Sequence, residues 1–279
     1  MSMYPKNTFK SLLMKLPLSE DRKTSLWASS VLSRQSREWA YFRCMELAMQ
    51  ELVRNVAADK LSLLEFGVGN GDRFIKLLQF RDYWIKRLDI KSRIIGVGFD
   101  TFDSLSDRRS EDVKPSRRGR HHSGDMEDLQ RFLVPRFGDF LLAKGLFSDT
   151  LEKKHSLLQE FPPIFVSVDC NYYSSTMDVL EQIIPELTPH GCLFYFDDVA
   201  LNYWSDKSGQ MRAIAEVNSG TFGPNIQLVE YPMTLETGLI QHYKRFYRLV
   251  NLETADNETA AERIGPPLQL SRHKRVSPL

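Results

Sequence analysis

Short apolar runs alternate with amphipathic segments along most of this chain, and that alternation limits the folds that it can adopt. Residues 36–56 and 72–88 carry apolar side chains at helical spacing, whereas the neighbouring runs 60–66 and 92–100 are almost continuously apolar. Continuously apolar strands separated by helices are typical of a parallel sheet that helices cover on both faces. The sequence therefore predicts an α/β fold with a mostly parallel sheet.

The same alternation continues to about residue 250, with no internal repeat and no second core. One helix and the third strand are expected within 131–147. The remaining strands are expected at 162–170, 193–198, 225–232 and 244–250, and further helices at 176–187 and 209–218.

This pattern predicts one principal domain, which spans residues 36–252. Residues 1–35 are expected to form an N-terminal extension, and the polar residues 253–279 a flexible C-terminal tail. Between the second and third strands, residues 106–123 form a dense polar run with several arginines. We expect this run to be a lid or acceptor loop, since long loops beside strand ends are often functional.

The composition excludes several classes of protein. The chain has 279 residues, 42% of them hydrophobic, and a formal net charge of +1, so no overall field attracts it to nucleic acid or an anionic membrane. No apolar run approaches the ~18 residues of a spanning helix. Three cysteines without metal-type spacing favour a reducing setting. We expect a cytoplasmic protein that binds neither nucleic acid nor membrane, and leave open whether it forms a homodimer.

Three glycines at alternate positions follow the first predicted strand. Gly67, Gly69 and Gly71 come directly after Glu65 in the stretch LLEFGVGNGDRF. Glycine permits a positive φ and the close approach of a ligand, so the stretch reads either as a cofactor loop or as a tight turn without a ligand. The spacing differs from the dinucleotide fingerprint, and the loop has no basic residue to meet a pyrophosphate. It resembles motif I of the class I S-adenosylmethionine methyltransferases.

Acidic residues stand at the ends of further predicted strands. Ligands of parallel α/β sheets bind beyond the carboxyl ends of the strands, where Asp100 is placed to accept hydrogen bonds from ribose hydroxyls. Asp169 and the pair Asp197 and Asp198 should converge at the same edge. Like charges that lie close together are costly unless a cation neutralises them, and oxygen ligands favour Mg²⁺ over zinc. The alternatives are a helix-capping role for Asp169 and a solvated loop for the pair.

Four segments of the chain together resemble the macrocin O-methyltransferase family. They are GVGFDTFDSL at 96–105, KGLFSDTL at 144–151, the block 166–199 that contains VSVDCNYYSST and LFYFDDV, and GQMRAIAEV at 209–217. The resemblance extends from about residue 60 to residue 250. Asn171 departs from it, because the family tends to have a second acid at that position.

This resemblance implies a fold, an activity and a set of site residues. The fold would be the Rossmann-like class I methyltransferase fold with a seven-stranded, mostly parallel sheet, and the activity a metal-dependent O-methylation of a sugar. The cofactors would be S-adenosylmethionine and Mg²⁺ or a similar divalent cation. The implied cofactor-binding residues are Glu65, Gly67, Gly69, Gly71, Asp100 and Thr101; the implied metal ligands are Asp169, Asp197 and Asp198, and Asp198 would also receive the proton.

Several acceptors and one other function stay open at this point. The acceptor is expected to be a small molecule or a glycan with two neighbouring hydroxyls, such as a sugar of a glycosylated natural product. A catechol-type acceptor also presents adjacent oxygens and fits the same three acids. A non-catalytic subunit that keeps the methyltransferase fold is the alternative from another class of protein.

Overall fold

The computed structural model describes residues 39–52, 58–103, 107–113, 124–188, 191–199, 205–230 and 245–254. The expected N-terminal extension, residue 106 and the run 114–123 of the expected lid, and the tail beyond residue 254 lie outside the described residues. Within the described ranges, no helix combines the length and the apolar character that crossing a membrane requires.

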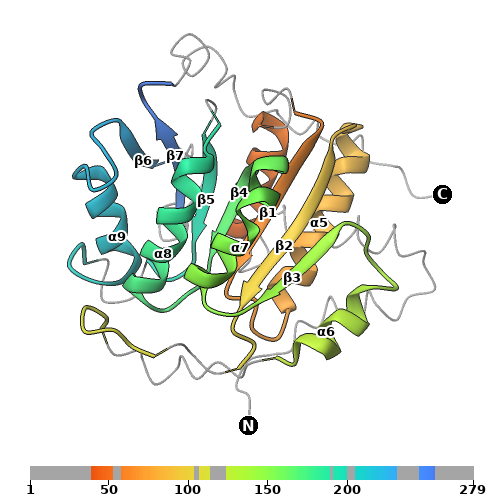
Figure 1. Cartoon of the computed structure of the whole chain (residues 1–279). Helices are drawn as coiled ribbons and strands as arrows, with labels where there is room; N and C mark the ends of the chain where they lie inside the picture. Colours follow the sequence, from red (N-terminus) through yellow and green to blue (C-terminus); the bar gives the residue numbers. More distant parts are fainter. Residues whose placement is uncertain are drawn as a thin grey trace, which may run out of the picture.

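One seven-stranded sheet forms the centre of the molecule, as the sequence predicts (Figure 1). Its strand order is β3-β2-β1-β4-β5-β7-β6, and only β7 runs antiparallel to its neighbours. The strands are β1 (Lys60–Phe66), β2 (Arg93–Asp100), β3 (Phe140–Lys144), β4 (Pro163–Val168), β5 (Cys192–Phe196), β6 (Ile226–Glu230) and β7 (Phe246–Asn251).

Helices cover both faces of this sheet, with a hydrophobic core on each side. One core joins the sheet to α3 (Trp39–Leu47), η2 (Ala48–Leu52), α5 (Asp72–Leu88) and α6 (Met126–Leu133). The other core joins it to α7 (Phe147–Glu160), α8 (Tyr173–Ile183) and α9 (Gly209–Asn218); Figure 1 shows α7 and α8 crossing in front of the sheet. A short 3₁₀ turn, η3 (Ile184–Glu186), ends α8.

The side chains of β1 alternate between these two cores. Leu61 and Leu63 pack on the face that α3 and α5 cover, whereas Leu64 and Phe66 pack on the opposite face. The strand period of two therefore turns Glu65 toward α3 and α5, where no water reaches it.

Helix α7 is one element that the sequence analysis does not predict. Its sequence FSDTLEKKHSLLQE is rich in charge, and only a narrow stripe that includes Leu151 and Leu158 is buried. Those two residues lie seven positions apart, which is two helical turns, so the signal is present but sparse.

The carboxyl ends of the central strands meet at one edge, and backbone hydrogen bonds extend the pairing beyond the strands themselves. Gly67 N donates to Phe99 O at 2.9 Å, and Asp169 N donates to Phe66 O at 2.8 Å. Asp197 N donates to Val168 O at 3.0 Å. The residues that follow β1, β4 and β5 are thereby held in register with one another.

Gly67 and Gly69 provide a matched test of how tightly this edge is packed. A Cβ at Gly67, where φ is +92°, would lie far inside van der Waals contact with the Asp169 carbonyl oxygen. A Cβ at Gly69, where φ is +55°, would meet none of the described residues within 4 Å. Gly67→Ala should lower the free energy of unfolding by roughly 2–4 kcal/mol, through overpacking and left-handed strain. Gly69→Ala should cost only about 1–2 kcal/mol, from the strain alone. Urea denaturation measures both, and equal losses would contradict this account.

Candidate active site

The glycine loop lies between the end of β1 and the start of α5. All three glycines have positive φ, +92° at Gly67, +55° at Gly69 and +86° at Gly71. Gly71 is packed against the Leu129 side chain of α6, while the space beside the Cβ position of Gly69 is open. The Gly69 carbonyl accepts from Gly124 N at 3.3 Å, so among the described residues the loop is open only on the Cβ side of Gly69. An open side of the backbone is what the approach of a ligand requires.

The Asp100 carboxylate holds this loop in place. Its Oδ2 accepts a hydrogen bond from Gly69 N at 2.8 Å, and its Oδ1 accepts one from Phe102 N at 2.8 Å. The Thr101 hydroxyl also donates to Oδ1, at 3.4 Å. Asp100 and Thr101, both predicted to bind the cofactor, thus lie against the loop that was predicted to bind it.

The Glu65 side chain points from β1 toward α3, into the core on that face of the sheet. Its side chain is completely buried, and its Oε2 accepts a hydrogen bond from the Tyr41 hydroxyl at 2.7 Å. Burial, partly offset by Arg73 and the bond from Tyr41, raises the pKa of Glu65 from its ordinary 4.5 to about 8. In the described structure Oε1 has no hydrogen-bond partner. The predicted contact of Glu65 with a cofactor stays a prediction.

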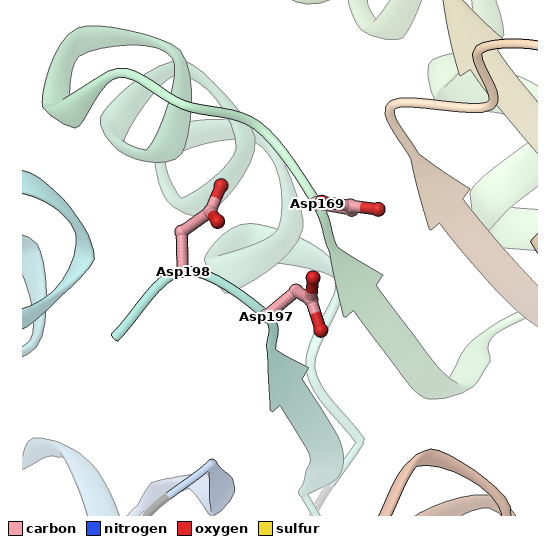
Figure 2. A group of neighbouring side chains, drawn as sticks. All are labelled: Asp169, Asp197 and Asp198. Carbon is pink, nitrogen blue, oxygen red and sulfur yellow. The ribbon is translucent and has the colours of Figure 1, made fainter. Parts of the chain in front are cut away.

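Three carboxylates converge where β4 and β5 end. Asp169, Asp197 and Asp198 each place an oxygen within 4.8 Å of the others (Figure 2). The structure therefore brings together all three residues predicted to bind a metal. A capping role for Asp169 was the alternative; in the first turn of α8, Ser174 N and Oγ donate to Asp112, at 2.9 Å and 2.7 Å.

Two arginines neutralise part of this acid cluster, which we define as Asp169, Asp197 and Asp198. Arg73 donates to Asp169 Oδ2 at 2.8 Å, and its second terminal nitrogen lies 3.3 Å from Asp197 Oδ1. Arg245 pairs with the same Asp197 oxygen at 2.8 Å and also bonds the Asp197 carbonyl. Burial by itself would raise the pKa of Asp197, but the two arginines lower it on balance.

Neither arginine was identified from the sequence. Arg245 immediately precedes β7, far from the acids along the chain. Arg73 did carry a signal, because it stands in the first turn of α5, where the helix dipole disfavours a cation. A basic residue at such a place indicates that acidic partners lie nearby.

Asp198 differs from the other two acids in its surroundings. Its backbone N–H donates to Gln210 Oε1 at 2.8 Å, and Gln210 Nε2 donates to Val168 O at 2.9 Å, which ties the β5 end to β4 through α9. In the described part of the chain, no hydrogen bond or ion pair to the Asp198 carboxylate is found. Burial, together with the charges of Asp169 and Asp197, raises the pKa of Asp198 to about 8.

The donors in the acid cluster suit a hard divalent cation. All three are carboxylates, which are ligands that Mg²⁺ prefers, and the group contains no histidine or cysteine. The nearby Cys170 is buried, which raises the pKa of its thiol and leaves it an inert, protonated side chain. The residues present therefore fit Mg²⁺ better than zinc.

The described part of the expected lid is anchored to α8. Asp112 is buried and accepts from Ser174 and, through Oδ2, from Arg109 N at 2.9 Å. The Arg109 side chain forms a bidentate pair with Asp178, at 3.0 Å and 2.8 Å. Residues 107–113 are therefore attached to α8 by these contacts. The rest of the expected lid lies outside the described residues, and its role stays a prediction.

Solved structures share this fold. No family model matches the sequence, and no curated protein does. The calicheamicin methyltransferase CalS11 has a TM-score of 0.55 and 18% sequence identity to this chain, over 90% of this chain and 94% of its own. The O-methyltransferase NovP has a TM-score of 0.50 and 17% identity, over 75% of this chain and 79% of its own.

The chain thus has the Rossmann-like fold of the class I methyltransferases, as its sequence predicts. Both of these structural neighbours are methyltransferases, which agrees with the resemblance found in the sequence.

Glu65 should make the stability of the protein depend on pH. Below pH 4.5 the group is protonated in both states; between 4.5 and about 8 the unfolded chain releases the proton while the folded protein keeps it. The free energy of unfolding should therefore fall as pH rises through this window, by at most about 1.4 kcal/mol per pH unit.

Glu65→Gln should remove this pH dependence, because the amide stays neutral at every pH. The buried Ser167, which lies opposite Glu65 in the β1–β4 register, offers a hydroxyl oxygen that can accept a hydrogen bond from the amide. The difference in stability between variant and wild type, measured by urea denaturation, should grow in favour of the variant from pH 5 to pH 8. Parallel pH profiles for the two proteins would contradict the assignment.

Proposed function

We propose that this protein is an S-adenosylmethionine-dependent O-methyltransferase that uses a divalent cation to methylate one of two neighbouring hydroxyls. The observation that carries the proposal is the position of the acid cluster directly beside the glycine loop. Gly67 and Asp169 are in backbone contact, so a ligand at the loop and one at the acids would be neighbours. Methyl transfer requires such proximity of cofactor and acceptor.

The glycine loop and Asp100 would form the cofactor site. S-Adenosylmethionine would supply the methyl group as a sulfonium, and its lack of phosphates agrees with a loop that has no basic residue. The backbone at Gly69 leaves room for it, and Asp100 and Thr101 present polar atoms at the end of β2. We also assign Glu65, which stands on β1 just before the loop, to this cofactor site.

The acid cluster would bind a divalent cation and, with it, the acceptor. A divalent cation there would lower the pKa of a hydroxyl and orient two neighbouring oxygens. Asp169, Asp197 and Asp198 would hold the cation. Arg245 and the Tyr195 hydroxyl, which donates to Asp197 at 2.8 Å, set the orientation of Asp197. Asp198, whose carboxylate pairs with no arginine among the described residues, would also receive the proton of the acceptor.

We further propose a sugar as the acceptor, on the basis of the sequence resemblance. A sugar with adjacent hydroxyls and a catechol both offer two oxygens to the acid cluster. An acceptor panel that contains a nucleotide-linked sugar, a glycosylated natural product and a catechol distinguishes them, and we expect methyl transfer to the sugars.

Asp100→Ala should weaken cofactor binding. The variant loses a carboxylate that accepts from Gly69 N and faces the cofactor site, and a lost charge-assisted acceptor costs about 1–3 kcal/mol. Isothermal titration with S-adenosylhomocysteine measures the change; Glu160→Ala, which removes an exposed carboxylate that pairs with Lys60 at the start of β1, is the control. Unchanged affinity in Asp100→Ala, or tighter binding of NAD than of S-adenosylhomocysteine by the wild type, would refute this cofactor site.

Removing the metal should abolish methyl transfer and leave cofactor affinity nearly unchanged, because the glycine loop and the acid cluster bind different ligands. Asp169→Asn and Asp197→Asn should lose activity that excess Mg²⁺ restores in part. Asp198→Asn should lose about 10²–10⁴-fold in kcat even at saturating Mg²⁺, because the proton acceptor is lost as well.

A radiolabelled methyl-transfer assay with and without chelator measures these effects. Full activity in chelator, or wild-type rates in all three variants, would show that the acids are structural. Cofactor binding without transfer to any member of the acceptor panel would favour the non-catalytic subunit.

A further inference from the structure

Arg73 is the residue of the site that neither the fold nor the proposed reaction explains. It is the second residue of α5, and its guanidinium contacts two members of the acid cluster, Asp169 and Asp197. Arg245 contacts one member alone. Arg73 therefore bridges the ends of β4 and β5, which is also what a metal ion bound by these carboxylates would do.

Aromatic rings hold the Arg73 guanidinium at this place. Its central carbon lies 5.4 Å from the ring centroid of Tyr41 and 5.8 Å from that of Tyr195. Both rings are buried, and each carries a hydroxyl that donates to a carboxylate, Glu65 and Asp197 respectively. Cation–π attraction and these fixed rings place the positive charge against the acids at little cost in side-chain freedom.

The acids in turn stabilise the cation. Burial works against the charged form of Arg73, yet Asp169 and Asp197 raise its pKa well above the ordinary range. Arg73 thus stays a cation at every relevant pH.

We propose that Arg73 is a built-in counter-ion of the acid cluster, which a divalent cation has to displace from Asp169 and Asp197 in order to bind. This inference rests on the proposed metal site, and it identifies a residue that sets the affinity of that site for the divalent cation. A guanidinium that already occupies two carboxylates lowers metal affinity in two ways, by occupying ligand oxygens and by repelling a second positive charge. Arg73 is accordingly a positioning residue that tunes metal binding, and the protein exchanges one cation for another at the same acids.

The proposal predicts the sign of a mutational effect. Arg73→Gln removes the competing charge while keeping a polar side chain, so the variant should bind Mn²⁺ at least tenfold more tightly than the wild type. A merely structural role for Arg73 predicts the opposite sign, because loss of an orienting contact loosens the carboxylates. Isothermal titration with Mn²⁺ alone, without cofactor or acceptor, measures the affinity.

Two further variants serve as controls. Arg73→Lys keeps the charge and should stay within about threefold of the wild type. Arg93→Gln removes the same unit of charge at the far end of β2, where Arg93 pairs with Asp139, and should leave Mn²⁺ affinity unchanged. An equal gain in Arg93→Gln would show that net charge of the protein, rather than Arg73, sets the affinity, and would overturn the proposal.

A second measurement covers the case in which Arg73→Gln folds poorly. If Arg73 and the metal are alternative cations for the same carboxylates, Mn²⁺ should raise the Tm of the variant more than it raises that of the wild type. Equal or weaker Mn²⁺ binding by the variant, or an equal gain in Tm, overturns the role of Arg73 and leaves the metal site standing. Absence of Mn²⁺ binding in both proteins overturns the proposed metal site as well.

Discussion

The mutual repulsion of three carboxylates at one edge of the sheet is the constraint on which the surrounding structure depends. Two unit charges within 4.8 Å repel each other by at least about 3 kcal/mol at an effective dielectric constant near 20. Arg73 and Arg245, which stand before and after the acids in the sequence, offset part of this repulsion by pairing with them.

The backbone of the sheet edge provides the rigidity that such a cluster needs. Hydrogen bonds from Asp169 to Phe66 and from Asp197 to Val168 continue the strand pairing past the last residues of β4 and β5. Because Gly67 has no side chain, the backbone after β1 lies in contact with the Asp169 backbone, and the glycine loop is adjacent to the acid cluster. The distance between the proposed cofactor and acceptor sites is thus decided by main-chain packing rather than by mobile side chains.

Buried polar residues fasten the next layer to this edge. Asp112, from the segment after β2, caps the first turn of α8, and Gln210 of α9 binds the backbones of Asp198 and Val168 at once. Both side chains are almost fully buried and have hydrogen-bond partners, so neither leaves an uncompensated polar group. The hydrogen bonds of Asp112 and Gln210 thus connect segments that are far apart in the sequence, because these buried polar side chains need hydrogen-bond partners.

The sequence by itself determined the class of fold, the glycine loop and the three acids, because these are local signals. Strand periodicity, glycine spacing and an acid at a strand end are each readable within a few residues. Helix α7 was not predicted, because only a sparse apolar stripe distinguishes its sequence from that of a charged loop. The sequence indicated neither the full burial of Glu65 nor its hydrogen bond with the Tyr41 hydroxyl.

Only the tertiary structure decided which charges meet. Arg73 and Arg245 reach Asp197 from sequence separations of more than a hundred and of nearly fifty residues, and no spacing rule relates them. Asp112 caps α8 because residues 107–113 lie against the start of that helix. Long-range electrostatics depends on distances in space, and those distances are set by the packing of the whole sheet and its helices.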